Sequence, residues 1–296
     1  MVDARGALDV KEEPGRPARH IPWGLSVYGI VLAALIVATL VPGWISPDNP
    51  LHGNLLVRLL PPGTRVNGHL YWLGTDTLGR DELSRLIWGA RVSFVVAISS
   101  VLMSGFIGTL FGIVSGYFGG PIAMILMRLA DIVLSIPFLL LAILIVTVIG
   151  PGLGSTILVL GTTRWPVYTR VAYGATLQVR EAEYIQAARS LGASNFRVMW
   201  RDVFPNVLSP LIVMATLEIG TMIMYEAALS FLGLGIQPPA PSWGNMLSSA
   251  QDYITQAWWL MMFPGLAVFL VVLSFNRIGD YVQQRLDPRL HDEKTI

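Results

Sequence analysis

The sequence lacks several features that common classes of protein require. It has no cysteine, which excludes a disulfide framework and thiolate chemistry. Only 13% of its 296 residues are charged, whereas soluble domains typically have about 25%. The formal net charge of +1 provides no basic surface that would neutralise the phosphates of a nucleic acid. We therefore expect neither an ordinary soluble domain nor a nucleic-acid-binding protein.

Lysine is nearly absent, and this excludes an ATPase site of the P-loop type. Such a site needs a Gly-Lys-Ser/Thr sequence, whose lysine reaches the phosphates. The two lysines of the chain are Lys11, which follows Val10, and Lys294, which follows Glu293. If ATP drives this protein, the ATP must be hydrolysed on another polypeptide.

Histidine is also scarce and forms no metal-binding pattern. None of the four histidines belongs to an HExxH motif, and all lie outside the apolar runs: His20, His52, His69 and His291. An intramembrane metalloprotease would need that motif, and a rhomboid-like protease would need a serine and a histidine within its spans. The sequence therefore predicts no metal site and no intramembrane enzyme.

Apolar sequence is abundant. Hydrophobic residues make up 53% of the chain, and the mean hydropathy is +0.60. A helix needs about 20 apolar residues to cross the hydrocarbon core of a bilayer. We predict an all-α polytopic membrane protein with six transmembrane helices, near residues 23–41, 92–118, 122–149, 155–173, 207–232 and 257–275. Pro137 is expected to kink the third of these spans, and Arg164 and Pro166 interrupt the fourth.

Arginine and lysine predict the orientation, because short cytoplasmic loops carry an excess of them. They are frequent in three regions that six spans would place on one side, residues 1–22, 180–206 and 277–296. We expect both termini and the middle segment in the cytoplasm. Residues 45–91 and 233–256 would then face the periplasm, and residues 92–276 would form a domain of five helices. The first span, which with Trp44 covers residues 23–44, is followed by no cleavage site and is expected to stay uncleaved.

One cytoplasmic segment, residues 183–205, is too polar to cross a membrane. It has the sequence EYIQAARSLGASNFRVMWRDVFP. Its first half has the spacing of a helix with one face formed by Tyr184, Ala187, Ala188 and Leu191. Alanine allows another backbone to approach closely, so this face suits a helix that docks on a cytoplasmic partner. The alternatives are a helix folded back on the protein's own spans and a helix lying on the lipid, which would favour Leu, Phe or Trp over Ala.

The second half of the segment is predicted to form another short helix. Gly192 can end the first helix in a left-handed cap, and Ser194 can serve as the N-cap of the second. Pro205 would close this second helix just before the fifth span. The helix would have one side formed by Phe196, Trp200 and Val203.

The segment resembles the EAA loop of ABC importer permeases. That loop has the pattern Glu-Ala-Ala, three further residues, a glycine and, some way on, a proline. Here Gln186, Ala187 and Ala188 correspond to Glu-Ala-Ala, Gly192 to the glycine and Pro205 to the proline. Gln186 departs from the acidic residue of the family, which removes the ionic contact of that acid but leaves the docking geometry unchanged.

Other stretches resemble one branch of these permeases, the dipeptide, oligopeptide and nickel permeases of the DppC, OppC and NikC type. The stretches are LGTDTLGRD at residues 73–81, SFLGLGIQPPAPSWGNML at 230–247, WWLMMFPGLAVFLVVLSFNRIGD at 258–280 and LDPR at 286–289. Together with the EAA loop they extend the resemblance over nearly the whole chain from the first span onward.

The resemblance implies a MetI-like permease fold with six spans in the bacterial inner membrane. In this family two similar permease subunits stand above two cytoplasmic ATPases, and a periplasmic solute-binding protein delivers the solute. ATP and Mg bind to the ATPases, so no cofactor is expected on this chain. The cargo would be a small peptide or, alternatively, a nickel chelate, an opine or an oligosaccharide, moved by alternating access. The residues implied to dock on the ATPase are Glu183, Tyr184, Gln186, Ala187, Ala188, Leu191, Gly192 and Pro205.

Two charged residues inside the predicted spans are candidates for the solute path, since intramembrane ionisable residues are usually functional. Glu218 lies roughly 16 Å into the fifth span at 1.5 Å per residue, and Arg164 lies near the middle of the fourth. They would either pair or line the path. A secondary transporter that uses them as a coupling pair is a remote alternative. It would predict inverted repeats, which we do not find, and it would leave the Ala-faced segment unexplained.

Other features of the spans and outer loops suggest structural or contact roles. Glu226 lies near the outer face and is expected to be structural or to gate the path, while Arg128 and Asp131 are one turn apart and could pair. Trp243 ends a stiff outer loop, residues 238–243, that would meet the binding protein or pack on the partner permease. A row of glycines in the second span should permit close helix packing: Gly105, Gly108, Gly112 and Gly116.

Overall fold

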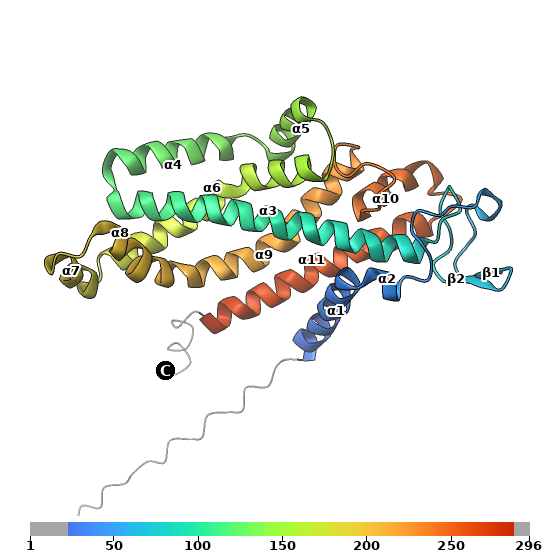
Figure 1. Ribbon diagram of the computed structural model, residues 1–296, viewed down its shortest axis with the longest axis horizontal. Helices are drawn as coiled ribbons and strands as arrows, with labels where there is room; N and C mark the ends of the chain where they lie inside the picture. Colours follow the sequence, from blue (N-terminus) through green and yellow to red (C-terminus); the bar gives the residue numbers. More distant parts are fainter. Residues whose placement is uncertain (1–22, 287–296) are drawn as a thin grey trace, which may run out of the picture.

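The computed structural model describes residues 23–286, which are mostly helical (Figure 1). The predictions for residues 1–22 and for residues 287–296, which include most of the LDPR motif, lie outside these residues, whereas residues 277–286 of the predicted C-terminal tail continue α11. The first half of the described chain contains α1 (Trp23–Leu40), α2 (Pro42–Ile45), a 3₁₀ turn η1 (Leu55–Val57), β1 (Thr64–Val66), β2 (His69–Tyr71), α3 (Glu82–Phe118), α4 (Gly120–Ser135) and α5 (Phe138–Ile149). The second half contains α6 (Leu153–Arg180), α7 (Glu183–Ser190), α8 (Asn195–Arg197), a π-helical segment η2 (Val198–Val203), α9 (Phe204–Phe231), α10 (Trp243–Ala250), η3 (Gln251–Tyr253) and α11 (Trp259–Leu286).

Within residues 23–286, three helices are long and apolar enough to cross a membrane. They are Glu82–Phe118, Asn195–Phe231, which joins α8, η2 and α9, and Trp259–Arg285. Ser26–Leu40 is a shorter apolar helix. The three long helices correspond to the predicted second, fifth and sixth spans, and the shorter helix corresponds to the predicted first span.

The helix α3 begins at Glu82, well before the predicted start of the second span at residue 92. Asp81 is its N-cap, and the Asp81 carboxylate accepts hydrogen bonds from the backbone nitrogen of Ser84 (2.7 Å) and from the Ser84 hydroxyl (2.6 Å). This cap satisfies a backbone donor that the first turn leaves free. The helix therefore extends beyond the apolar run from which the span was predicted.

The predicted third span is broken rather than kinked. The axes of α4 and α5 differ by 91°. Ile136 is extended, with φ −92° and ψ 125°, because the ring of the following proline, Pro137, disfavours the helical conformation at the residue before it. With 12 residues, α5 is about 18 Å long, too short to cross the hydrocarbon core alone.

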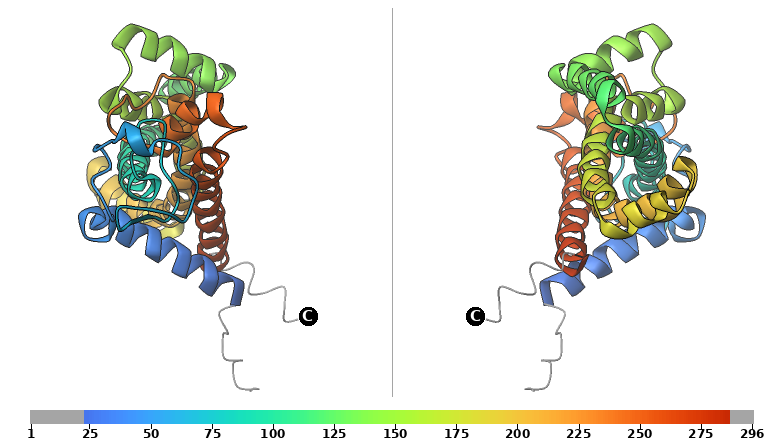
Figure 2. Two further views of the ribbon diagram at one scale, coloured as in Figure 1. Left: turned by 90° about the vertical axis from the view of Figure 1, so that its right-hand side faces the viewer. Right: turned by 90° about the vertical axis from the view of Figure 1, so that its left-hand side faces the viewer.

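The predicted fourth span lies within α6, which is less apolar than the other long helices. It packs against α3, α9, α4 and α5 (Figure 1). Figure 2 shows the bundle end-on, with α4 and α5 on one side of this core and α1 and α11 on the other. Because other helices surround α6, much of its polar surface is shielded from the lipid. This shielding allows a helix that contains arginine and threonine to stand within the bundle.

The glycine row of α3 brings its backbone against α6, as predicted. A methyl group added at Gly112 would lie 2.6 Å from the carbonyl oxygen of Thr169, and one added at Gly116 would lie 2.6 Å from the Cβ of Thr176. Neither site has room for a side chain. The row therefore serves packing within the chain, through the small-residue contacts that are common between membrane helices.

The segment before α3 folds into a compact structure at one end of the molecule. Its LGTDTLGRD stretch centres on Asp76, whose carboxylate accepts bonds from the Arg80 nitrogen (2.9 Å) and the Arg80 Nε (2.7 Å) and lies 3.4 Å from the Arg85 Nε. The indole of Trp259 donates to the Thr75 carbonyl (3.3 Å) and attaches the start of α11 to this segment. Two of the four recognised stretches, those at 73–81 and 258–280, thus meet at this end.

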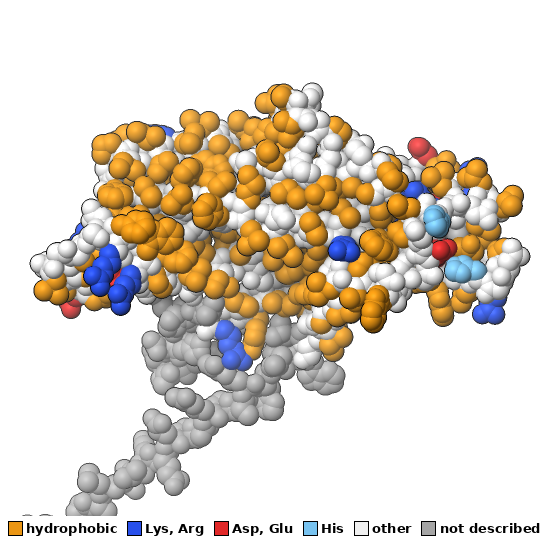
Figure 3. Space-filling model, in the orientation of Figure 1, with side chains coloured by type: hydrophobic (Ala, Val, Ile, Leu, Met, Phe, Trp, Pro, Cys, Tyr) orange, Lys and Arg blue, Asp and Glu red, His pale blue; other side chains and the backbone are white. Residues whose placement is uncertain are grey.

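The two ends of the bundle differ in character. The β1–β2 hairpin and α10 lie at one end and α7 and α8 at the other (Figure 1). Hydrophobic side chains cover most of the long body between them, and a group of Lys and Arg side chains lies near α7 and α8 (Figure 3). This distribution agrees with a bundle that crosses a membrane along its length.

The close approach of α3 and α6 predicts a strong effect of a larger side chain at Gly112. We expect Gly112→Leu to force the helices apart and to lower the stability of the purified protein by about 1–3 kcal/mol or more. Thermal unfolding of the protein in nanodiscs measures this change. Gly174→Leu in α6 is the matched control, because a Cβ at Gly174 meets no atom within 4 Å. Equal melting temperatures for the two variants would contradict the packing described here.

Candidate coupling surface and intramembrane charges

The helix α7 leaves the predicted alanine face uncovered. Tyr184 and Leu191 are 51% and 88% exposed, Ala187 is exposed and Ala188 is half-buried. Within α7 (Glu183–Ser190), Ile185 is the buried residue and packs in the main hydrophobic core. The helix is therefore fixed by Ile185 while its alanine face stays open. This arrangement differs from a helix that folds its alanine face back on its own bundle.

The turn after α7 has the predicted geometry. Gly192 has a φ of +81°, which a residue with a side chain rarely adopts. The backbone nitrogen of Ala193 donates to the Ala188 carbonyl (3.1 Å), and that of Gly192 donates to the Arg189 carbonyl (2.9 Å). These two bonds form a Schellman cap. Ser194 is the N-cap of α8, as predicted.

The structure contradicts the predicted role of Pro205. Pro205 is the second residue of α9 and follows directly on the π-helical segment η2, so it does not separate residues 183–205, here called the coupling segment, from the span. The helix is continuous from Asn195 to Phe231 and contains the π-helical segment η2. Of the predicted side, Val203 is buried, while Phe196 and Trp200 are exposed.

A hollow of about 350 Å³ lies beside the exposed face of α7. Its lining combines small and apolar groups with two arginines and one acid: Ala188, Leu191, Gly192, Ala193, Arg197, Arg201 and Asp202. Both arginines are exposed. The surface therefore offers shape, apolar area and positive charge to a partner.

Gln186 has a structural explanation that the family pattern did not provide. Its Nε2 donates a hydrogen bond to the carbonyl oxygen of Glu181 (3.1 Å), at the end of α6. An ionised glutamate has no donor for this bond. Glu183 stands in the first turn of α7, where a negative charge interacts favourably with the helix dipole.

Arg164 and Glu218 form a bidentate ion pair. The Arg164 Nη2 lies 2.6 Å from the Glu218 Oε1, and its Nε lies 3.2 Å from the Oε2. The guanidinium also lies over the ring of Tyr225, 5.6 Å from its centroid, and Tyr225 stacks on Phe138. The Arg164 and Glu218 side chains are 18% and 6% exposed, so the pair is largely buried within the bundle. Of the two predicted arrangements, the structure thus has the paired one.

Glu226 is completely buried near the C-terminal end of α9. Its carboxylate accepts hydrogen bonds from the hydroxyls of Ser93 (2.7 Å) and Ser230 (2.8 Å), and the Ser230 oxygen accepts from the Ile236 nitrogen (3.0 Å). The group therefore connects α3, α9 and the loop that follows α9. These contacts agree with the structural role among the two predicted for Glu226.

Trp243 does not lie on the surface of the loop that was predicted to meet the binding protein or the partner permease. Trp243 is 0% exposed, and its indole nitrogen donates to the carbonyl oxygen of Leu86 (3.0 Å). Trp243 is the first residue of α10 and directly follows Ser242, the N-cap residue of a capping box. It packs against Gly89 of α3. The exposed part of the loop is residues 237–240.

Asp131 does not form the predicted local pair with Arg128. It pairs with Arg170 of α6 instead, at 2.7 Å between the Arg170 Nη2 and the Asp131 Oδ1. The pair joins α4 to α6, and half or more of each side chain is exposed.

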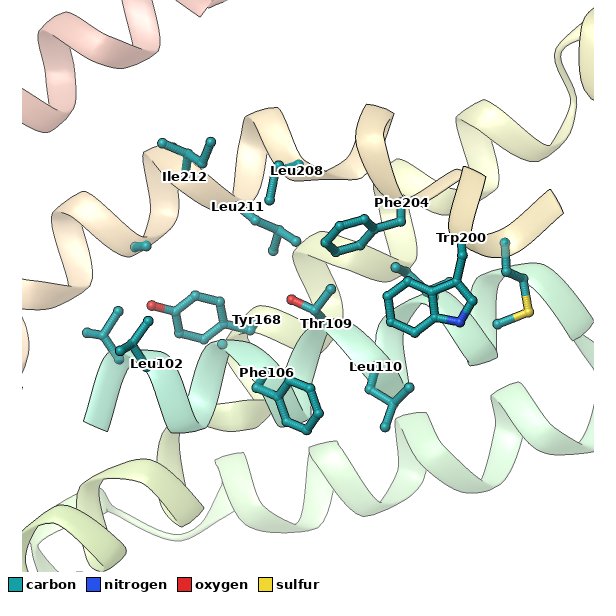
Figure 4. Close-up of a pocket in the computed structure, with 15 residues that line it drawn as sticks. Leu102, Phe106, Thr109, Leu110, Tyr168, Trp200, Phe204, Leu208, Leu211 and Ile212 are labelled. Carbon is teal, nitrogen blue, oxygen red and sulfur yellow. The ribbon is translucent and has the colours of Figure 1, made fainter. Parts of the chain in front are cut away.

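An apolar groove of about 370 Å³ runs between α3, α6 and α9 (Figure 4). Leu102, Phe106 and Leu110 come from α3, whereas Leu208 and Ile212 come from α9. Its polar groups are those of Thr109, Tyr168 and the Trp200 indole, so it provides no charged partner for the termini of a peptide. Among the described residues, no group of three or more His, Asp or Glu side chains could hold a metal ion.

The sequence matches the family described as "Binding-protein-dependent transport system inner membrane component" over residues 108–292, more than half of the chain. The chain belongs to this family. It is a permease and a multi-pass protein of the bacterial inner membrane.

Two relatives place the permease more closely. The "Di/tripeptide transport system permease protein DppC" of Pseudomonas aeruginosa (strain UCBPP-PA14) is 43% identical over 264 residues, which cover 88% of this chain and 87% of that protein. The "Dipeptide transport system permease protein DppC" of Escherichia coli (strain K12) is 42% identical over 267 residues, covering 90% and 89%. These matches confirm the predicted DppC-type branch.

Two solved structures share the fold. The MetNI methionine ABC transporter in an inward-facing conformation has a TM-score of 0.51 and 21% identity, covering 65% of this chain and 94% of that chain. An amino acid ABC transporter with histidines has a TM-score of 0.51 and 16% identity, covering 68% and 94%. The fold is MetI-like, as predicted.

Sequence reasoning missed two residues that fix the coupling segment. Ile185 was missed because most residues of this helix are polar or small. The available signal was that it is the one β-branched aliphatic residue in Glu183–Ser190. Tyr117 lies in the last turn of α3, and its hydroxyl donates to the Asn195 Oδ1 (2.9 Å), a contact between residues far apart in the sequence. No local pattern indicates such a contact.

The ion pair predicts a non-additive effect on stability. We expect Arg164→Met to destabilise the permease by about 3–5 kcal/mol, because it leaves the buried carboxylate of Glu218 without its partner. The double variant Arg164→Met/Glu218→Leu should recover most of this loss, since no buried charge remains. Thermal unfolding of the purified variants gives the comparison. A double variant as unstable as Arg164→Met alone would contradict the pairing.

Proposed function

We propose that this permease imports small peptides and is driven by ATPases on separate chains. The observation that carries the proposal is the uncovered alanine face of α7, held by Ile185 beside a basic hollow. The peptide cargo is supported by the relatives, which are named as transporters of dipeptides and tripeptides. A nickel chelate, an opine or an oligosaccharide would use the same machinery, but these relatives favour a peptide.

The proposed complex contains two permeases, two cytoplasmic ATPases and a periplasmic solute-binding protein. This chain has no lysine in a P-loop, so ATP and Mg would bind on the ATPases and this chain would hold no cofactor and catalyse no reaction. The docking residues would be those of α7 and the following turn, with Tyr184, Ala188 and Leu191 as the contact face. Arg197 and Arg201 would require an acidic surface on the ATPase.

The proposed mechanism is alternating access. Closure of the ATPases around ATP would move α7 and α8, and the continuous helix from Asn195 to Phe231 would transmit the movement into the bundle. ATP can shift the inward–outward equilibrium only through its different affinity for the two states. The loaded binding protein would act in the same way at the outer end.

We further propose that Arg164 and Glu218 border the solute path. The pair is partly exposed at its arginine, and neighbouring Tyr225 adds an aromatic ring. If the pair serves the path, the double variant Arg164→Met/Glu218→Leu should stay folded and lose uptake. Wild-type uptake with an unchanged preference among peptides would show that the pair has only a structural role. Glu226, by contrast, is proposed to hold the outer ends of α3 and α9 together.

The proposal predicts uptake that depends on ATP and not on a proton gradient. Proteoliposomes containing the complete complex and its binding protein should take up a dipeptide when ATP is supplied to the ATPases, and a protonophore should leave this uptake unchanged. The control is a complex whose ATPases lack the P-loop lysine, which should take up none. Uptake driven by a proton gradient without ATP would contradict the proposal and favour a secondary transporter.

A further inference from the structure

Tyr117 stands where α3 meets the coupling segment. It is the second-last residue of α3 and only 5% exposed. Its hydroxyl donates a hydrogen bond to the Asn195 Oδ1 at 2.9 Å, and the Arg189 guanidinium lies over its ring, 4.4 Å from the centroid. Arg189 belongs to α7 and Asn195 to α8. One side chain of α3 therefore contacts both helices of the coupling segment.

The same end of α3 is also tied to α6. The Nη1 of Arg180, at the end of α6, donates to the carbonyl oxygens of Gly116 (3.1 Å) and Tyr117 (3.4 Å). Carbonyls in the last turn of a helix have no partner within the helix, and a positive charge there interacts favourably with the helix dipole. Together with the glycine contacts, this bond makes the ends of α3 and α6 a single packed unit.

From these contacts we propose that Tyr117 transmits the movement of the coupling segment to the α3–α6 unit. The inference rests on the proposed function and adds a second route to it. The first route, along the chain into α9, passes through η2, where a π-helical turn interrupts the α-helix. The second route joins α8 to α3 through a contact between residues that are 78 positions apart.

The Tyr117 contacts are directional, whereas the neighbouring apolar contacts are not. Ile185, Val198 and Val203 are buried in the same core as Tyr117, but apolar burial is non-directional and permits sliding. A hydrogen bond and a cation–π contact have preferred geometries and fix the position of one helix relative to another. Tyr117 is thus a positioning residue, which makes no contact with solute or ATP.

The test measures dipeptide molecules transported per ATP hydrolysed, in proteoliposomes with the complete complex and its binding protein. Tyr117→Phe keeps the ring for Arg189 and removes the bond to Asn195, so the ratio should fall about two- to tenfold, as expected for one hydrogen bond. Tyr117→Leu removes both contacts and should lower the ratio further. ATP hydrolysis should continue in both variants, because the docking surface is unchanged.

Matched variants separate positioning from folding. Asn195→Asp keeps an oxygen acceptor and should retain the wild-type ratio, whereas Asn195→Leu should match Tyr117→Phe. Combining Tyr117→Phe with Asn195→Leu should lower the ratio no further than either change alone, since both remove the same bond. Tyr28→Phe in α1 makes the same chemical change outside the coupling segment and should have no effect.

Two results would overturn the inference while leaving the proposed function intact. One is a wild-type ratio in both Tyr117 variants. The other is a parallel loss of uptake and ATP hydrolysis in Tyr117→Phe at a constant ratio, which indicates a defect of assembly. A wild-type complex that hydrolyses ATP without taking up dipeptide would instead overturn the proposed function, and this inference with it.

Discussion

The close contact between α3 and α6 is the constraint on which the rest of the structure depends. Apolar side chains gain little by leaving lipid for another helix, so membrane helices associate through close packing and polar contacts. Gly112 and Gly116 permit this packing, because α3 has no side chain at these positions and α6 fills the space. Once α6 lies against α3 and α9, it can carry Arg164 within the bundle, where Glu218 of α9 neutralises it. The polar residues of α6 therefore depend on the glycines of α3, which allow α6 to pack inside the bundle.

This core also relates the two ends of the molecule. At the end of the bundle that holds the β1–β2 hairpin, α3 begins at the Asp81 cap, beside the Asp76 cluster, and Ser93 of α3 donates a hydrogen bond to Glu226 of α9. At the opposite end, Tyr117, the second-last residue of α3, contacts the coupling segment. The LGTDTLGRD stretch and α10 thus lie at one end of the bundle and the segment of residues 183–205 at the other, while the stretch at 258–280 runs along α11 between them. The apolar body between them requires only hydrophobic character and close packing.

Composition and local patterns predicted much of this architecture. Apolar runs located the long helices, and the i, i+3, i+4 spacing with Gly192 predicted α7 and its cap. The errors have physical causes. Hydropathy cannot reveal that α3 extends to Glu82, because the extension is fixed by a cap in a polar stretch. Pro137 indicates a bend but not its 91° angle, which depends on packing around α5. Pairs such as Asp131–Arg170, and the burial of Trp243, depend on which helices become neighbours. A single sequence does not specify that.

The central claim is that α7 presents a docking face to an ATPase on another chain. The absence of cysteine permits a direct measurement, because an introduced cysteine is the only thiol of this permease. Ala188→Cys should crosslink through a short bifunctional reagent to an ATPase that carries one cysteine in its permease-facing cleft. Val148→Cys, on the exposed surface of α5, should not. A complex that assembles and hydrolyses ATP but gives no crosslink from residue 188, or an equal yield from residue 148, would contradict the account.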